Sequence, residues 1–154
     1  MTFYGQFLTD KYIQEYFPMN YIGTCIEIGA TDGIGLSNTY YFQKKGWQTL
    51  CIEPNPFFLA NLIQNRQAVE NVACGSENLN DQEFVVYVLQ GNNQTAISGL
   101  KTDNRLVKSH NHLIQDKKII KTHVRTLDSI LEKHIIKDGL LMSYSVLGVK
   151  IDQH

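Results

Sequence analysis

One stretch near the N-terminus limits the possible folds more than any other, because a short apolar run passes directly into a glycine-rich loop. The run is TCIEIG, and Gly29, Gly33 and Gly35 lie in the loop that follows it. Glycines let a backbone pass close to a ligand, and the first amides of a following helix face that ligand. The stretch predicts a buried strand, a tight loop and a helix from Leu36 to Lys45. Tight strand-to-helix turns also use glycine without any ligand, so the loop alone leaves that alternative open.

The same alternation of strand and helix patterns continues along the chain. WQTLCIEP predicts a second strand, PFFLANLIQNRQ predicts an amphipathic helix with Pro56 in its first turn, and Ala68 to Cys74 predicts a third strand. Further on, EFVVYVL and IIKTHV predict strands, TLDSILEKH predicts a helix capped by Thr126, and GLLMSYSVLGVKID predicts one or two final strands. Gly91 to about Lys118 predicts a long loop. The pattern predicts an α/β fold with a doubly wound, Rossmann-like, mostly parallel sheet.

Length and composition indicate one domain of ordinary globular type. The 154 residues match the roughly 150 expected for one domain, so we expect a single domain over 1–154, with a helical lead-in over 1–20 and an α/β core over 21–154. The lead-in helix runs from Thr9 or Asp10 to about Phe17. Because 14 basic and 15 acidic residues give a net charge of −1, no nucleic-acid partner is indicated. No membrane span or export signal is found, so we expect a soluble, cytoplasmic protein.

Cysteines and histidines do not form a metal-binding pattern. Cys25, Cys51 and Cys74 each lie in a short apolar stretch, and their spacing fits neither CxxC nor an even disulfide framework. They are expected to be buried thiols in a reducing compartment, and a reactive nucleophile is the alternative. His110 and His112 in HNH lack a third ligand at metal spacing, so we expect solvated loop histidines and no metal.

Two glutamates flank the glycine loop and indicate a nucleotide cofactor. Glu53 ends the second predicted strand, 20 residues after Gly33, where doubly wound folds place a carboxylate on ribose hydroxyls. Glu27 stands two residues before Gly29 and is expected to face the same crevice. There it would attract the ammonium and sulfonium end of S-adenosylmethionine but repel a pyrophosphate. In the alternative interpretation, Glu27 points away and pairs with a lysine or an arginine.

Several segments together resemble the FkbM-like methyltransferases, a branch of the class I S-adenosylmethionine-dependent fold. They are GQFLTDKYIQEYF, GTCIEIGATDGIGLSNTYYFQKKGW, CIEPNPFFLANLIQNR, SGL at Ser98 to Leu100 and VRTLDSIL at Val124 to Leu131. They span most of residues 5–131. The combination of an acidic-glycine loop followed by SNT, GW before the second strand and EPNP after it is specific to that family.

The resemblance implies S-adenosyl-L-methionine as cofactor and methyl transfer to a hydroxyl of a sugar or small metabolite. It implies that the glycine loop holds the methionine end, that Asp32 shapes its turn, and that Asn71 to Ala73 lie near the adenine. Ser37 can instead be a helix residue or cap, and Asn55 a turn former. The residues expected at the cofactor are Glu27, Gly29, Ala30, Asp32, Gly33, Ser37, Glu53, Pro54, Asn55, Asn71 and Ala73.

The sequence departs from the family pattern in two places. Gln43 stands where the family usually has a glutamate before the lysine, which removes any ion pair made there. The family also continues after its TLDSIL-like helix with a strand ending in aspartate and a DxEG motif. Here Asp152 in VKID is the candidate for that aspartate and for the catalytic base, but no EG follows it. We therefore expect a sheet that is incomplete at its C-terminal edge. By chemistry alone, the other candidate bases are His110, His112 and His123.

Two other functions remain open from the sequence. IGATDGIG also resembles the TGxxxGIG loop of NAD(P)-dependent short-chain dehydrogenases, and Asn92 and Asn93 resemble their NNAG. That family's YxxxK is missing, because Lys150 stands six residues after Tyr144, and EPNP has no place there. The missing DxEG motif motivates a third hypothesis, in which the chain is a non-catalytic cofactor-binding remnant of the methyltransferase fold.

Overall fold

The computed structural model describes residues 2–90, 98–100, 111–135 and 144–146. None of the helices in these ranges is long and apolar enough to cross a membrane. In chain order the elements are η1 (Gln6–Leu8), α1 (Thr9–Gln14), β1 (Thr24–Ile28), α2 (Tyr40–Lys44), β2 (Gln48–Ile52), α3 (Pro56–Asn65), β3 (Ala68–Glu70), β4 (Ala73–Cys74), β5 (Leu79–Leu89), β6 (Gly99–Leu100), η2 (Asn111–Leu113), β7 (Ile114–Arg125), α5 (Leu127–Ile135) and β8 (Tyr144–Val146).

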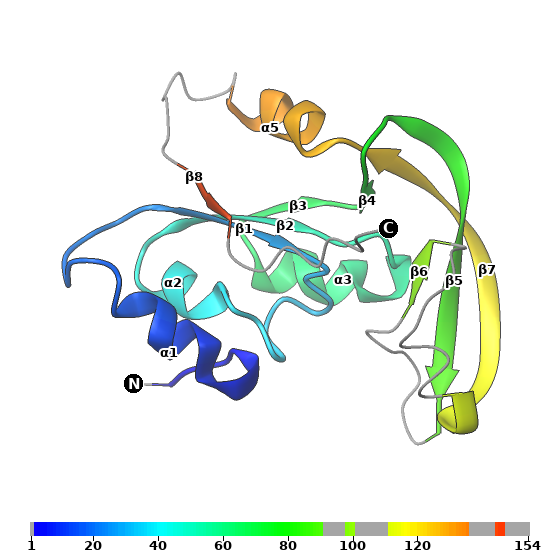
Figure 1. The fold of residues 1–154 in the computed structure, drawn as a ribbon, viewed down its shortest axis with the longest axis horizontal. Coiled ribbons are helices and arrows are strands. Elements are labelled where there is room, and N and C mark those ends of the chain that lie inside the picture. The colour runs from blue at the N-terminus through cyan, green and yellow to red at the C-terminus, as the bar shows by residue number, and fades with distance from the viewer. Residues whose placement is uncertain (1, 91–97, 101–110, 136–143, 147–154) are drawn as a thin grey trace.

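A parallel sheet of four strands in the order β3-β2-β1-β8 forms the centre of the molecule (Figure 1). β1 pairs in parallel with β2 and with β8, and β2 pairs in parallel with β3. Ile26 at the middle of β1 is in register with Leu50 of β2 and Val146 of β8. The strands predicted at TCIEIG and WQTLCIEP are therefore confirmed, together with the parallel strand, helix, strand connection between them.

Helices cover both faces of this sheet, which explains why its strands are almost continuously apolar. Successive side chains of a strand point to opposite faces. Ile26 packs in one buried cluster with Ile130 of α5, while its neighbour Cys25 packs with residues of α2 on the other face. Cys51 of β2 packs with Leu62 of α3. In Figure 1, α5 lies above the sheet, and α2 and α3 lie below it.

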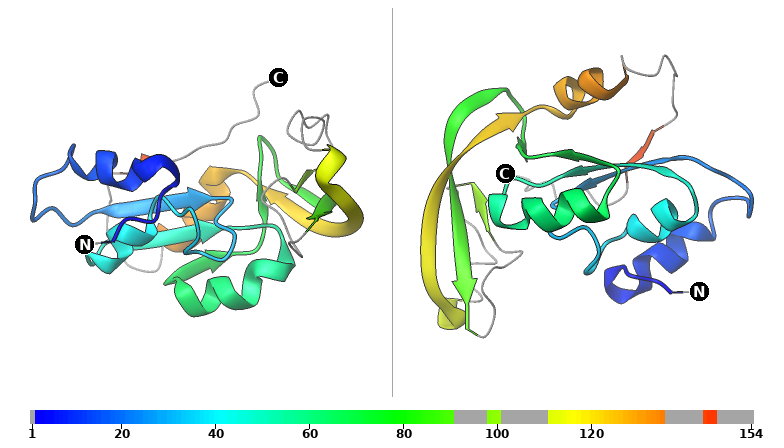
Figure 2. Two further views of the ribbon diagram at one scale, coloured as in Figure 1. Left: turned by 90° about the horizontal axis from the view of Figure 1, so that it is seen from below. Right: turned by 180° about the vertical axis from the view of Figure 1, so that it is seen from behind.

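A second, mixed sheet replaces part of the single sheet that the sequence predicted. Its order is β4-β7-β5-β6, with β4 parallel to β7 and the other pairs antiparallel. It stands beside the parallel sheet, on the side toward which β1 and β2 run (Figure 1, Figure 2). The prediction of one strand from Ala68 to Cys74 was wrong, because the chain leaves the parallel sheet after Glu70. The Asn71 side chain donates to the Glu53 carbonyl at 2.7 Å where a strand would continue.

The two long strands of the second sheet extend beyond their predicted limits. Ile114 to Lys118, predicted as part of a loop, belongs to β7 and pairs with β5. Most side chains in this half of β7 are exposed, so no apolar alternation marks it as a strand. Backbone pairing with β5 holds it instead, and that pairing is not visible in the sequence. The rest of the predicted loop is described only at residues 98–100 and 111–113.

The helices α1 and α2 are shorter than the sequence predicted, while α5 begins at its predicted cap. The prediction that α2 begins at Leu36 was wrong, because the Ser37 hydroxyl accepts hydrogen bonds from Thr39 N and Tyr40 N and holds a turn before the helix. The lead-in helix α1 stops at Gln14, three residues before the predicted end. Thr126 caps α5 as predicted, accepting from Ser129 N at 3.2 Å.

The C-terminal turn of α5 is tied to β3 through Glu70. Burial alone would raise the pKa of Glu70, but hydrogen bonds from Lys133 at 2.7 Å and His134 at 2.8 Å lower it below its ordinary value. This contact joins the helix on one face to the edge strand of the sheet.

Leu62→Ala is expected to lower the free energy of unfolding by about 2–5 kcal/mol, because Leu62 is completely buried between α3 and β2. The matched control is Ile63→Ala, whose side chain is 59% exposed and should cost less than about 0.5 kcal/mol. Equilibrium urea unfolding of both variants measures the difference. Equal losses would contradict the packing of α3 through Leu62.

Candidate functional site

Three segments meet at the carboxyl edge of the parallel sheet, and Glu53 touches all of them. Glu53 follows β2, and its Oε2 accepts a hydrogen bond from Thr31 N, in the loop after β1, at 2.9 Å. The carbonyl of Glu53 accepts from Asn71 Nδ2, just after β3, at 2.7 Å. Gly29 N, at the start of the β1 loop, donates to the carbonyl of Ile52 at 2.8 Å. Open α/β sheets bind ligands at this edge, so these loops form the candidate site.

Glu53 is a buried carboxylate that keeps acceptor capacity. It is 5% exposed, and burial raises its pKa above the ordinary value, while the backbone N–H groups of Asn55 and Thr31 act in the lowering direction. Oε1 accepts from Asn55 N at 2.8 Å. A carboxylate oxygen has two lone pairs, so each oxygen can still accept a hydrogen bond from a ligand hydroxyl.

Asn55 is both a helix cap and a source of an unpaired donor. Its Oδ1 accepts from Phe57 N at 3.1 Å at the first turn of α3, so the alternative of a turn-forming role is confirmed. The residue is 1% exposed, and its Nδ2 has no hydrogen-bond partner among the described residues. A buried donor without a partner costs about 1–3 kcal/mol. A ligand acceptor beside Glu53 would remove that cost.

Two of the three loop glycines, Gly29 and Gly33, are favoured as glycine for different reasons. Both have positive φ, +77° at Gly29 and +83° at Gly33. A Cβ on Gly29 would meet nothing within 4 Å, which leaves this face of the loop open. A Cβ on Gly33 would lie 2.6 Å from Cγ of Arg66 and 2.8 Å from Cδ1 of Leu62. Gly29 is therefore the glycine that fits close approach of a ligand, and Gly33 makes room for a side chain.

Asp32 and Ala30 support the loop from within. Oδ1 of Asp32 accepts from Ile34 N at 2.9 Å and from Gly35 N at 2.8 Å, so its predicted role in shaping the turn is confirmed. Ala30 is 2% exposed and packs against the α3 side of the sheet.

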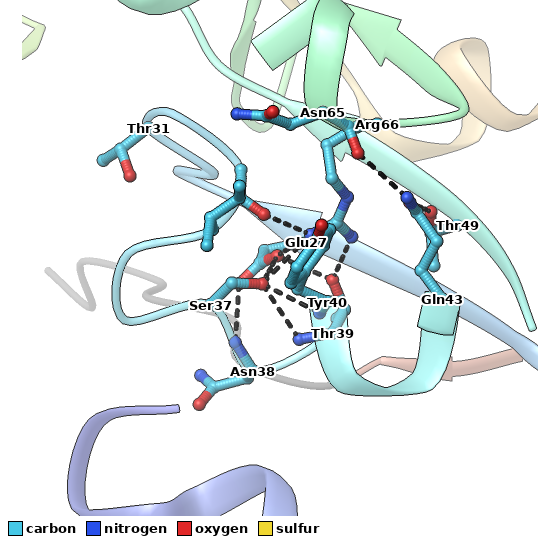
Figure 3. Close-up of polar contacts among 12 residues, drawn as sticks. Glu27, Thr31, Ser37, Asn38, Thr39, Tyr40, Gln43, Thr49, Asn65 and Arg66 are labelled. Carbon is cyan, nitrogen blue, oxygen red and sulfur yellow. Dashed lines mark hydrogen bonds and ion pairs between the residues drawn. The ribbon is translucent and has the colours of Figure 1, made fainter. Parts of the chain in front are cut away.

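Glu27 is paired inside the protein, as Figure 3 shows. Its Oε1 accepts from Asn38 N at 2.9 Å. Its Oε2 accepts from the hydroxyls of Ser37 at 2.7 Å and Thr39 at 2.6 Å, and lies 3.3 Å from Nη1 of Arg66. The pairing with an arginine, which the sequence left open, is confirmed. Contact between Glu27 and a cofactor stays a prediction.

Arg66 is the residue that sequence reasoning missed. It follows α3, its side chain is 0% exposed, and Nη1 donates to the Gly33 carbonyl at 2.8 Å and the Ser37 hydroxyl at 3.0 Å. Nη2 donates to the Thr39 hydroxyl, and the guanidinium lies 5.6 Å from the Tyr40 ring centre. The one signal in the sequence is a glutamate inside an apolar strand, because a buried carboxylate requires a partner. That signal does not say which cation is the partner.

Gln43 makes neutral hydrogen bonds where the family's glutamate would stand. Its Nε2 donates to the Asn65 carbonyl at 2.9 Å, and its Oε1 accepts from the Thr49 hydroxyl at 2.6 Å. The substitution of glutamine for glutamate therefore leaves α2 connected to both β2 and the end of α3.

The remaining predicted residues lie apart from this network or outside the described residues. Pro54 follows Glu53 and is partly buried. Ala73 lies in β4, 5% exposed and in register with Val124, so it belongs to the second sheet. Asp152 and His110 lie outside the described residues.

Among the described residues, no group of three His, Cys, Asp or Glu side chains could hold a metal. His112 lies in η2, and His123 is exposed on β7.

The cysteines fit the prediction of buried thiols at two of three positions. Cys25 and Cys51 are 0% exposed, and burial raises the pKa of each thiol to about 12. Cys74 is half-buried, and burial raises its pKa as well. Because the thiolate is the nucleophile, these environments argue against a reactive cysteine.

Gly33→Ala is expected to destabilise the protein more than Gly29→Ala. Left-handed backbone costs both alanine variants roughly 1–2 kcal/mol, and crowding against Arg66 adds about 1–3 kcal/mol at position 33 alone. Urea unfolding measures both losses. A Gly29→Ala loss as large as that of Gly33→Ala would contradict the open face at Gly29.

Comparison with known families identifies the family of this chain. A family model described as the methyltransferase FkbM domain matches residues 27–140, more than half of the chain. No curated protein and no solved structure matches the chain. The matched range begins at Glu27 and contains Glu53, Arg66 and the glycine loop. The resemblance seen in the sequence is thereby confirmed, and the chain belongs to the FkbM methyltransferase family.

Proposed function

We propose that this protein binds S-adenosyl-L-methionine at the carboxyl edge of the parallel sheet and methylates a hydroxyl of a sugar or small metabolite. The observation that carries the proposal is Glu53, a buried carboxylate tied to the loop after β1 and placed at the end of β2. Carboxylates at this position bind the ribose hydroxyls of nucleotide cofactors. Membership of a methyltransferase family supports this cofactor over a nicotinamide dinucleotide.

The residues at this edge fit the cofactor's chemistry. Glu53 would accept hydrogen bonds from the ribose hydroxyls, the Nδ2 donor of Asn55 would meet an acceptor of the nucleoside, and the open face at Gly29 would allow close backbone approach. When bound, the cofactor supplies a methyl group on a sulfonium. The task of the chain is then to orient acceptor oxygen and methyl for in-line displacement, which can supply much of the rate. Asp152 stays the proposed base for the acceptor hydroxyl.

The alternative of a cofactor-binding remnant makes a different prediction about turnover. Labelled methyl transfer to a panel of sugars and small hydroxylated metabolites distinguishes the two. Transfer supports the enzyme, and tight cofactor binding without transfer to any acceptor favours the binding module.

Glu53→Gln is expected to weaken binding of S-adenosylhomocysteine by about tenfold to a hundredfold, because a hydrogen bond to a charged group contributes about 1.5–3 kcal/mol. Calorimetric titration measures the affinity. The matched control is Glu77→Gln, an exposed residue before β5, which should bind as the unmodified chain does. Melting temperatures of both variants show that the fold is kept. No detectable binding by the unmodified chain would refute the proposal.

Cofactor affinity is expected to fall as pH decreases through the raised pKa of Glu53. The ionised carboxylate is the better acceptor, so affinity declines as pH falls through a pKa that burial raises above the ordinary glutamate value. In the ligand-free protein, the raised pKa means that the folded state binds this proton more tightly than the unfolded state does. The carboxyl group therefore stabilises the fold at low pH, and this contribution is lost as pH rises through its folded-state pKa. Calorimetry across this range tests the effect. Glu53→Gln should remove this dependence, and an unchanged profile would contradict the assignment.

A further inference from the structure

Arg66 contacts only one part of the candidate site, the segment that leads from the glycine loop into α2. Its guanidinium donates to Gly33, Ser37, Thr39 and Glu27, all within or beneath that segment (Figure 3). Arg66 itself comes from the end of α3, the helix that begins just after Glu53. One side chain therefore connects the two halves of the site through the protein interior.

The charges of Glu27 and Arg66 balance within the protein, although Nε of Arg66 has no hydrogen-bond partner among the described residues. The carboxylate of Glu27 receives four donors, two of them side-chain hydroxyls, one a backbone N–H of Asn38 and one from Arg66. An ionised carboxylate offers about four acceptor positions. Three of these donors meet Oε2 and one meets Oε1, so Oε1 alone keeps an acceptor position, and the charge of Glu27 is already balanced by Arg66.

The network also sets the shape of the loop. Nη1 of Arg66 donates a hydrogen bond to the Gly33 carbonyl at 2.8 Å. The aliphatic part of the arginine lies so close to Gly33 that a Cβ on residue 33 would lie 2.6 Å from Cγ of Arg66. Asp32 holds the next turn through two backbone N–H groups. The loop is thus organised from below by buried side chains, while its face at Gly29 stays open.

We infer that Arg66, together with Glu27, is a positioning residue for the methionine end of the cofactor site and contacts no ligand itself. The inference rests on the proposed function and goes beyond it, because it assigns Glu27 to the loop and not to the ligand. Its energetic basis is preorganisation: a loop already held in its binding shape loses little conformational entropy when a ligand arrives. The adenosine half is expected to depend less on this pair, because Glu53 is held at the end of β2 by Asn55 N as well as by Thr31 N of the loop.

Two ligands allow the two halves of the site to be tested separately. S-adenosylhomocysteine carries both adenosine and the amino-acid end, whereas methylthioadenosine keeps the adenosine and lacks the amino-acid end. Calorimetric titration of each ligand against the same variant therefore reports the two halves independently. A purely structural role would change both affinities together.

Removing Arg66 alone leaves a buried carboxylate without its cation, which can prevent folding. The main variant is therefore the double change Arg66→Met with Glu27→Gln, which removes both charges. Arg66→Lys is the conservative variant, because it keeps a cation near Glu27 but cannot reach Gly33 and Thr39 together. The matched control is Arg125→Met, since Arg125 also joins two elements, donating to the Leu79 carbonyl of β5 and the Val124 carbonyl of β7, but in the second sheet.

The double variant is expected to bind S-adenosylhomocysteine about tenfold more weakly and methylthioadenosine within about twofold of the unmodified chain. Arg66→Lys should recover part of the loss, and Arg125→Met should bind both ligands normally. Equal weakening for both ligands, or no weakening for either, would overturn the inference while the proposed function stands. If the unmodified chain binds neither ligand, the proposed function fails and the inference fails with it.

Discussion

A carboxylate and a guanidinium that are both removed from water hold the candidate site in shape. Glu27 is in β1 and Arg66 follows α3, so the pair joins two elements that are far apart in the sequence. Breaking such a pair by removing one partner leaves an uncompensated buried charge, which is strongly destabilising. The hydroxyls of Ser37 and Thr39 each donate to Glu27 and accept from Arg66, and these bonds hold the segment before α2 in place. The conformation of the glycine loop therefore depends on this buried pair.

The two glutamates at the carboxyl edge have different roles, since Glu27 holds the loop and Glu53 is the proposed ligand contact. Glu27 accepts four hydrogen bonds from the protein and is paired with Arg66, whereas Glu53 accepts one hydrogen bond on each carboxylate oxygen and lies beside the unpaired donor of Asn55. Both glutamates are buried, and a buried polar group without a partner costs free energy, so each carboxylate requires hydrogen-bond partners. The same residue type at the ends of neighbouring strands thus serves two purposes. This division makes the effects of Glu53 and Arg66 variants separable by ligand.

Sequence patterns were reliable where burial and capping decide the local structure. β1 and β2 lie where apolar runs predicted them, and Thr126 caps its helix as predicted. The sequence patterns failed where a contact between distant residues overrides the local conformational preference. The break after Glu70 depends on Asn71 bonding to Glu53, and the outer half of β7 depends on pairing with β5. Neither contact leaves an apolar period in the sequence.

The sequence by itself determined the parallel strand and helix pattern around the glycine loop, the two glutamates beside it and the family. These are properties of neighbouring residues, and burial periodicity and short motifs record them directly. Only the tertiary structure decided that Glu27 pairs with Arg66, that Gly33 makes room for that arginine and that Gly29 faces open space. The partner of a buried charge is chosen by the packing of α3 against the parallel sheet. That choice joins residues 39 positions apart, so no local pattern can contain it.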